Sequence, residues 1–243
     1  MGCFQTAPLL LCLIHALLER NIPLSIILGQ WYVTTTDPAI HDLIRLRRSP
    51  RSFDTRPVER NVVKTLLEAA RWAASCYNTQ PWRYIVAFQE DEEAFNRLLG
   101  CLMEVNQHWA KHAPVLLVSL ARTLHDHNGK PNRWAWHDVG AANAQLTAQA
   151  TAMGLVVHQM AGYDPSAVGT LYTLEPIFEP VTLLALGYPG SPDRLETSLR
   201  ERETALRQRK PLEEIAFNGT WGNPLRGANE ERLAGCHHGH LPG

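Results

Sequence analysis

The spacing of apolar positions changes along the chain and predicts its secondary structure. Spacings of three and four residues, which mark amphipathic helices, recur over about Val58–Ala74, and further helices are predicted over about Glu92–Glu104 and over the charged segment Leu195–Gln208. Short apolar runs, which mark buried strands, occur at Trp82–Phe88, Val115–Leu120, Leu155–Met160 and Val181–Leu186. The pattern therefore predicts an α+β domain in which helices outnumber strands.

Two further helices have recognisable ends. Asp37 is an N-cap type and Pro38 suits the first helical position, so a helix follows them and ends at Pro50. Its apolar stripe consists of Ile40, Leu43, Ile44 and Leu46. The longest helix is predicted over about Trp134–Met153, ending at Gly154. It is rich in glycine and alanine, which let helices approach closely, so we expect it to be central or to form a dimer interface.

The two ends of the chain differ from its middle. Residues 1–33 hold two apolar runs interrupted by Glu19, Arg20 and Asn21, and neither reaches the ~20 residues that a membrane span needs. The first six residues lack the basic residue of a secretory signal but match the loose myristoylation pattern. An extra helix and a misplaced start codon are alternative interpretations. We expect a leader over 1–33 that the fold does not need, a domain over 34–224 and a flexible tail over 225–243.

The composition suits an ordinary globular protein and limits its partners. The 243 residues are 45% hydrophobic and 19% charged, which fits one domain. A net charge of -1 gives no electrostatic case for a nucleic-acid partner, and we expect no stable membrane insertion. The five cysteines are odd in number and form no CxxC pair, which favours a reducing compartment and a cytoplasmic protein.

Several common site motifs are missing from the sequence. It has no GxGxxG after a strand, no P-loop and no GxSxG elbow. His108 and His112 are spaced as two metal ligands on a helix, but no third ligand follows at the next turn. We therefore expect no metal site there, and we assign no function to the cysteine and histidines near the end of the chain.

The strongest local signal is Arg47-Arg48-Ser49-Pro50-Arg51. Three guanidinium groups and a hydroxyl have only Asp42 and Asp54 nearby in sequence. A phosphate ester is a natural partner for such a group, although a solvated basic helix end is the alternative when the cluster is taken alone. A second polar segment, Ser75–Trp82, joins a helix to a strand and could hydrogen-bond the edge of a heteroaromatic ring.

In this order, these segments resemble the nitroreductase family of FMN-dependent, dimeric oxidoreductases. The resemblance covers roughly three quarters of the chain, from about Ile40 to Trp221. Its motifs are Arg47–Phe53 with Pro57-Val58, Ala69–Arg71, Asn78–Arg83, Trp109 with Ala113–Val115, Asp138–Gly140, His158–Asp164, Leu186–Pro189 and Arg209–Ile215. The family implies a central mixed β-sheet surrounded by helices, with the long helix at the dimer interface of a homodimer.

The resemblance also implies roles for individual residues. Arg47, Arg48 and Ser49 would hold the FMN phosphate, helped by Arg207 and Arg209. Arg51 would lie near the N1/O2 edge of the flavin, where negative charge gathers on reduction. The residues implied to lie along the ring are Ser75, Cys76 and Asn78 from the other subunit, Met160, Ala161 and Gly162 near N5, and Asn106 at the pyrimidine edge.

The implied activity is a ping-pong reduction. NADH or NADPH would give hydride to the flavin, and an electron-poor substrate such as a nitroaromatic or a quinone would take it, with no dedicated protein acid or base. The alternatives are a specialised relative acting on one metabolite or on flavin, a flavin-binding protein without turnover, and a purely structural dimer. Where the family commonly reads APSxxNxQPW, this chain has Ala74 and Tyr77, a departure that concerns substrate preference more than FMN binding.

Overall fold

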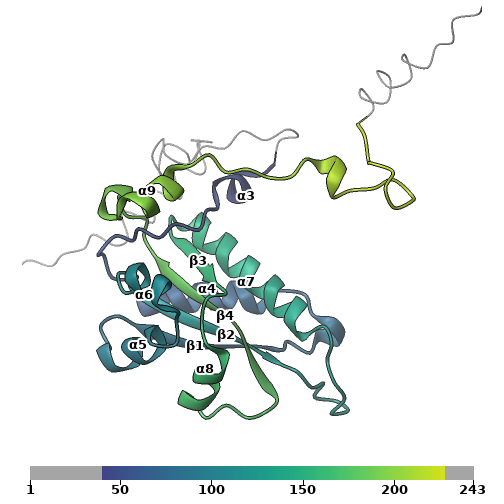
Figure 1. The fold of residues 1–243 in the computed structure, drawn as a ribbon. Coiled ribbons are helices and arrows are strands. Elements are labelled where there is room, and N and C mark those ends of the chain that lie inside the picture. The colour runs from purple at the N-terminus through teal and green to yellow at the C-terminus, as the bar shows by residue number, and fades with distance from the viewer. Residues whose placement is uncertain (1–39, 228–243) are drawn as a thin grey trace, which may run out of the picture. The chain divides into compact units, whose positions relative to one another are not determined.

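The computed structural model describes residues 40–227 (Figure 1). The chain divides into two compact units, the first ending at Ala205 and the second beginning at Leu206. The division into a leader, a domain over 34–224 and a tail stays a prediction. The expected N-cap at Asp37-Pro38 lies outside the described residues.

A four-stranded antiparallel sheet forms the centre of the first unit. Its strands are β1 (Trp82–Phe88), β2 (Val115–Arg122), β3 (Val156–Met160) and β4 (Phe178–Gly187), in the spatial order β1-β2-β4-β3. The register pairs Trp82 with Ala121 and Met160 with Leu183. The α+β fold class is confirmed, and the predicted strands are all present.

The resemblance implied a mixed sheet, and for the described strands this expectation is wrong. Every pairing among the described strands is antiparallel. β2 and β3 run in the same direction with a helix between them, which would give a parallel pair if they were neighbours. β4 lies between them and pairs antiparallel with both, so no parallel ladder forms.

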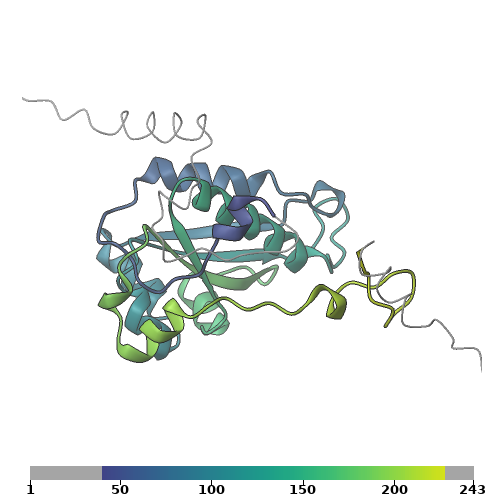
Figure 2. The same cartoon turned by 90° about the horizontal axis from the view of Figure 1, so that it is seen from above.

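Helices cover both faces of the sheet. The helices of the first unit are α3 (Asp42–Leu46), α4 (Arg60–Arg71), α5 (Glu92–Leu99), α6 (Glu104–Ala110), α7 (Ala135–Ala152), α8 (Pro165–Leu171) and α9 (Thr197–Thr204). Short 3-10 turns occur at Cys76–Asn78, Pro192–Arg194 and Leu212–Glu214. Helices α4 and α7 lie together along one face (Figure 2). The opposite face carries α5, α6 and α8 (Figure 1).

The alternation of side chains along β2 divides the core in two. Val115 and Leu117 pack with α4 and α7, whereas Leu116 and Val118 pack with α5, α6 and α8. All four side chains are fully buried. A strand covered on both faces needs apolar residues at every position, which is why this segment reads as a continuous apolar run.

Some helices differ from their predicted spans. The helix expected over Glu92–Glu104 is two helices, because Gly100 caps α5 and the next residues leave the helical path. There Leu102 pairs with Tyr163 in an isolated bridge, and a new helix starts at Glu104. The long helix has nearly the predicted bounds, and it ends before Gly154, whose φ of 73° is the left-handed conformation that glycine adopts readily.

Helix α3 buries less of its apolar stripe than predicted. Only Leu46 is buried, and Ile44 is 62% exposed. The N-cap observed is His41, whose Nδ1 accepts a hydrogen bond from the amide of Leu43 over 3.2 Å. The exposed apolar side of this short helix faces a cavity, described next.

Candidate functional site

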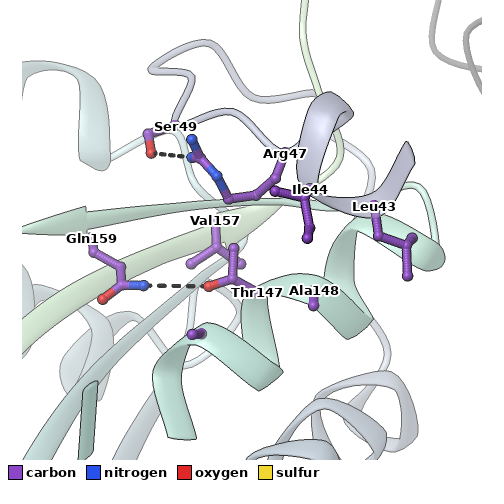
Figure 3. A pocket seen from close by; sticks show the side chains of 9 residues that line it. Leu43, Ile44, Arg47, Ser49, Thr147, Ala148, Val157 and Gln159 are labelled. Atoms are coloured by element: carbon purple, nitrogen blue, oxygen red, sulfur yellow. Dashed lines mark hydrogen bonds between the residues drawn. The ribbon is translucent and has the colours of Figure 1, made fainter. Parts of the chain in front are cut away.

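A cavity of about 330 Å³ lies between α3, α7 and β3 (Figure 3). It is lined by Leu43, Ile44, Arg47, Ser49, Ala144, Thr147, Ala148, Val157 and Gln159. Most of its wall is apolar, and the polar groups form two pairs. Nη1 of Arg47 donates to the hydroxyl of Ser49 over 3.0 Å, and Nε2 of Gln159 donates to the hydroxyl of Thr147 over 3.3 Å. A cation and a hydroxyl thus meet in a cavity whose wall is mostly apolar.

The loop that carries Arg47 and Ser49 is anchored to the end of α9. Nη2 of Arg48 donates to the carbonyl of Ala205 over 3.0 Å and to that of Glu203 over 3.4 Å. The amide of Arg51 donates to both carboxylate oxygens of Glu203, each at 3.0 Å. These contacts join residues about 150 positions apart in sequence and fix the backbone of the arginine loop.

His158 supports the same loop from β3. Its Nδ1 lies 3.0 Å from the carbonyl oxygen of Pro50, so this nitrogen carries the proton and donates. Its ring lies 4.6 Å from that of Trp109, centroid to centroid. Burial is the largest cause that lowers the pKa of His158, from 6.5 to about 4, and the nearby cations Arg51 and Arg47 lower it further. His158 is therefore neutral at pH 7.

We expect His158 to make the folding stability fall as the pH is lowered from 6.5 towards 4. The native side chain stays neutral in that window while the unfolded chain takes up a proton, so protonation favours unfolding. The expected loss is on the order of 2–3 kcal/mol. Urea unfolding at pH 7 and pH 4.5 measures it, and His158→Gln should show a smaller loss. The exposed His108→Gln should behave like the wild type, and an equal loss in all three proteins contradicts the expectation.

A second polar group fixes the turn after β3. The hydroxyl of Thr182 donates to the carbonyl of Met160 over 2.7 Å. Nδ2 of Asn106 and the amide of Met103 both donate to the carbonyl of Gly162, over 3.1 Å and 3.0 Å. A Cβ at Gly162 would lie 2.6 Å from Nδ2 of Asn106, so a larger residue there would displace this side chain.

This turn directs its carbonyls inward and leaves donors available. Within residues 40–227, the amides of Ala161 and Gly162 donate to no protein acceptor. Ala161 is exposed and Gly162 is partly exposed. Two adjacent N–H groups on a fixed backbone can therefore donate to an acceptor atom of a bound ligand.

Comparison with known proteins identifies the fold. A model of the Nitroreductase family matches residues 44–188. The chain belongs to the nitroreductase family. It is 37% identical over 137 residues to an uncharacterized 15.4 kDa protein of Mycolicibacterium smegmatis, a match that covers 55% of this chain and 88% of that protein.

Two further similarities carry functional names. A provisionally named NADH dehydrogenase/NAD(P)H nitroreductase of Streptomyces coelicolor is 27% identical over 166 residues, covering 60% of this chain and 80% of that protein. A crystal structure described as an oxidoreductase containing FMN superimposes with a TM-score of 0.74. It is 32% identical, and the match covers 78% of this chain and 96% of that one.

The segment Ser75–Gln80 of this nitroreductase-family chain forms a strained loop. Tyr77, Asn78 and Gln80 have φ of 52°, 53° and 46°, values that cost free energy in residues other than glycine. The amide of Cys76 donates to Oδ2 of Asp138 over 2.9 Å, and the amide of Gln80 donates to the hydroxyl of Ser75 over 3.0 Å. The side chain of Asp138 is buried at the start of α7, so this helix holds the loop in shape.

The structure brings only some of the predicted site residues together. Arg47 and Ser49 line the cavity, and Asn106 meets Gly162. The cavity lining contains none of Ser75, Cys76 and Asn78, which the resemblance assigns to the flavin of the other subunit. Arg207 and Arg209 belong to the second compact unit, and their help in holding a phosphate stays a prediction.

Several residues of the site were missed by sequence analysis. Glu203 and Thr147 lie in segments without a motif, so no local signal marked them, and Gln159 lies within the quoted motif His158–Asp164 but was not singled out. Asp138 and His158 do belong to quoted motifs, but their roles as supports become visible only from their partners, Cys76 and Pro50. All five act through contacts between distant segments.

No group of three or more metal-ligating side chains comes together between residues 40 and 227. In the same part of the chain, no helix combines the length and the apolar character that a membrane span requires.

Proposed function

We propose that this nitroreductase-family oxidoreductase binds FMN and reduces small electron-poor organic molecules, such as nitroaromatics or quinones, with NADH or NADPH. Bound FMN would supply the redox chemistry, accepting hydride from the nicotinamide and passing it to the second substrate in a ping-pong cycle. The observation that carries the proposal is the meeting of Arg47 and Ser49 in the cavity between α3, α7 and β3. The FMN in the similar solved structure and the name of the Streptomyces relative support it.

The donors of the site fit an FMN molecule at both of its ends. The guanidinium of Arg47 and the hydroxyl of Ser49 suit the phosphate, which carries charge and several acceptor oxygens. The amides of Ala161 and Gly162 suit a ring acceptor such as N5. Val157 and the side chains of α7 provide apolar surface in the cavity. The chain therefore offers anion donors, an apolar wall and backbone donors to such a cofactor.

Arg51 supplies a fixed positive charge beside the proposed ring position. Burial lowers the pKa of its guanidinium, but an arginine remains cationic at neutral pH. Its backbone amide is held by Glu203, so the base of this side chain is fixed before negative charge develops on the reduced ring. We propose that Arg51 favours reduction of the cofactor in this way.

We propose that two chains form a homodimer through α7, with FMN at the subunit interface. Gly140 is exposed near the start of α7, four residues before Ala144, which lines the cavity, and residues spaced by four lie on one face of a helix. Small side chains on such a face let two helices approach closely. In such a dimer, Ser75, Cys76 and Asn78 would contact the flavin of the partner subunit. We expect the protein to be located in the cytoplasm.

An absorbance spectrum of the purified protein tests the proposed function first. We expect flavin bands near ~450 nm that bleach when NADH or NADPH is added without oxygen. Turnover with quinones and nitroaromatics should follow. Bound flavin that no nicotinamide reduces would point to a flavin-binding protein without turnover. A colourless protein that takes up no added FMN would contradict the proposal.

A further inference from the structure

Glu203 is a buried carboxylate that no motif of the family resemblance includes. It lies on α9 and is only 5% exposed. Both of its oxygens accept the amide of Arg51 at 3.0 Å, and Oε1 also accepts the amide of Ser52 at 3.4 Å. A single side chain thus binds two consecutive amides of the loop that carries the proposed phosphate ligands.

Residues 50–52 are also held by hydrogen bonds to elements other than α9. Nδ1 of His158 donates to the carbonyl of Pro50, and the hydroxyl of Ser52 donates to the carbonyl of Ser191 over 2.6 Å. Residues 50–52 are therefore fixed by α9, by β3 and by the segment before α9. A loop held from three elements has little freedom to rearrange when a ligand arrives.

Burial makes the charged form of this carboxylate unfavourable in the fold. Burial raises the pKa of Glu203, while the amides of Arg51 and Ser52 and the cations Arg51 and Arg48 oppose the shift only in part. A raised pKa means that the ionised form is less favourable in the fold than in water, so ionised Glu203 costs folding free energy above that pKa. A costly buried charge with well-formed hydrogen bonds suggests a role in fixing one conformation.

We propose that Glu203 is a positioning residue for the cofactor site, holding Pro50–Ser52 so that Arg47, Ser49 and Arg51 are in place before FMN binds. The inference rests on the proposed function. The direction in which the FMN affinity changes when Glu203 is removed tests this role, because Glu203 is a negative charge close to a site for an anion. If only its charge mattered, its removal would strengthen FMN binding. If its hydrogen bonds position the loop, its removal weakens binding.

The first test is the affinity for FMN of Glu203→Gln, measured by quenching of FMN fluorescence. Glutamine keeps the size of the side chain but places an NH2 group opposite a backbone amide. We expect binding about tenfold weaker or more, the size typical of a lost hydrogen bond to a charged group. Glu203→Asp, which keeps the charge but withdraws the oxygens, should also weaken binding. Glu201→Gln, an exposed charge removal on the same helix, should bind like the wild type.

The pH dependence separates positioning from a general structural effect. The charged and titratable groups around Glu203 are Arg48 and Arg51 on the loop, Arg202 on α9, and His158 behind Pro50. As the pH falls through the pKa of Glu203, the wild-type carboxyl becomes neutral like glutamine. The ratio of the Glu203→Gln and wild-type dissociation constants should therefore shrink towards one. The titration of the FMN phosphate affects both proteins and cancels in the ratio.

Hydrogen exchange tests the inference without FMN. In the cofactor-free protein, the amides of Arg51 and Ser52 should exchange faster in Glu203→Gln than in the wild type, and Glu201→Gln should not change them. Unchanged exchange, or FMN binding that is unchanged or tighter in Glu203→Gln, would overturn the positioning role. If the wild type binds no FMN, the proposed function fails, while faster exchange in the variant still supports the loop contact.

Discussion

The double variant Arg47→Ala, Arg48→Ala is expected to purify without flavin and to bind added FMN at least about a hundredfold more weakly than the wild type. Each charge-assisted hydrogen bond to a phosphate contributes about 1.5–3 kcal/mol, and every 1.4 kcal/mol is tenfold in affinity. Arg47 reaches the cavity beside Ser49, and Arg48 follows it on the anchored loop. Titration of the variant into FMN, followed by fluorescence, measures the loss.

Two controls separate the loss of ligands from a loss of structure. Arg71→Ala with Arg97→Ala removes two exposed arginines that pair with neighbouring glutamates on α4 and α5, and it should leave FMN binding unchanged. Arg48 also binds carbonyls at the end of α9, so thermal unfolding of the single variants shows how much of the effect is structural. A double variant that still holds one FMN per subunit would show that the phosphate binds elsewhere.

The layered fold could be read from the sequence because its core strands are covered on both faces. A strand such as β2 needs an apolar residue at each position, and Val115–Leu120 has this character apart from Ser119. Ser119 is tolerated because its hydroxyl donates to the carbonyl of Thr182 and accepts from Asn143. The end of α7 was equally clear, because Gly154 adopts a conformation that few other residues reach.

Features that depend on the order of the strands in the sheet could not be predicted from local sequence patterns. Nothing within β2, β3 or β4 states that β4 lies between the other two, and this one fact makes the sheet antiparallel. The break after α5 was missed for a similar reason. The bridge of Leu102 to Tyr163 draws the chain out of the helical path, and it joins segments about 60 residues apart. Tertiary pairing overrode a helical apolar spacing there.

The residues of the candidate site also fall into two groups, those that the sequence indicated and those that only the structure shows. The arginine cluster stood out in the sequence because three cations within five residues have few acidic residues nearby to neutralise them. In the structure, Arg47 and Ser49 of this cluster line the cavity. The supports of that cluster could not be seen, since Glu203 and His158 reach the loop from positions more than 100 residues away. Sequence thus indicated the groups that would touch the ligand, whereas the structure added the groups that hold them.

We expect Gly140→Arg to convert the protein to a monomer and to weaken FMN binding at least about tenfold. Gly140 is exposed near the start of α7, and a Cβ added there meets no atom within 4 Å. The isolated chain can therefore accept the larger side chain, and replacing a helical glycine even favours the helix by up to about 1 kcal/mol. In the proposed dimer, the same position faces another helix at close range, so a buried arginine without a partner would prevent assembly. Sedimentation velocity measures the mass of the variant.

The outcome for FMN then decides whether the interface and the cofactor site are linked. Asn96→Arg places the same side chain at an exposed position on α5, on the opposite face of the sheet, and should leave both the dimer and FMN binding intact. A monomeric Gly140→Arg with full FMN affinity would mean that each chain binds the cofactor alone, so Ser75, Cys76 and Asn78 would have no role across the interface. A Gly140→Arg dimer would instead place the interface away from α7. Loss of both properties together is what a shared site requires, because the loop of one chain then completes the flavin pocket of the other.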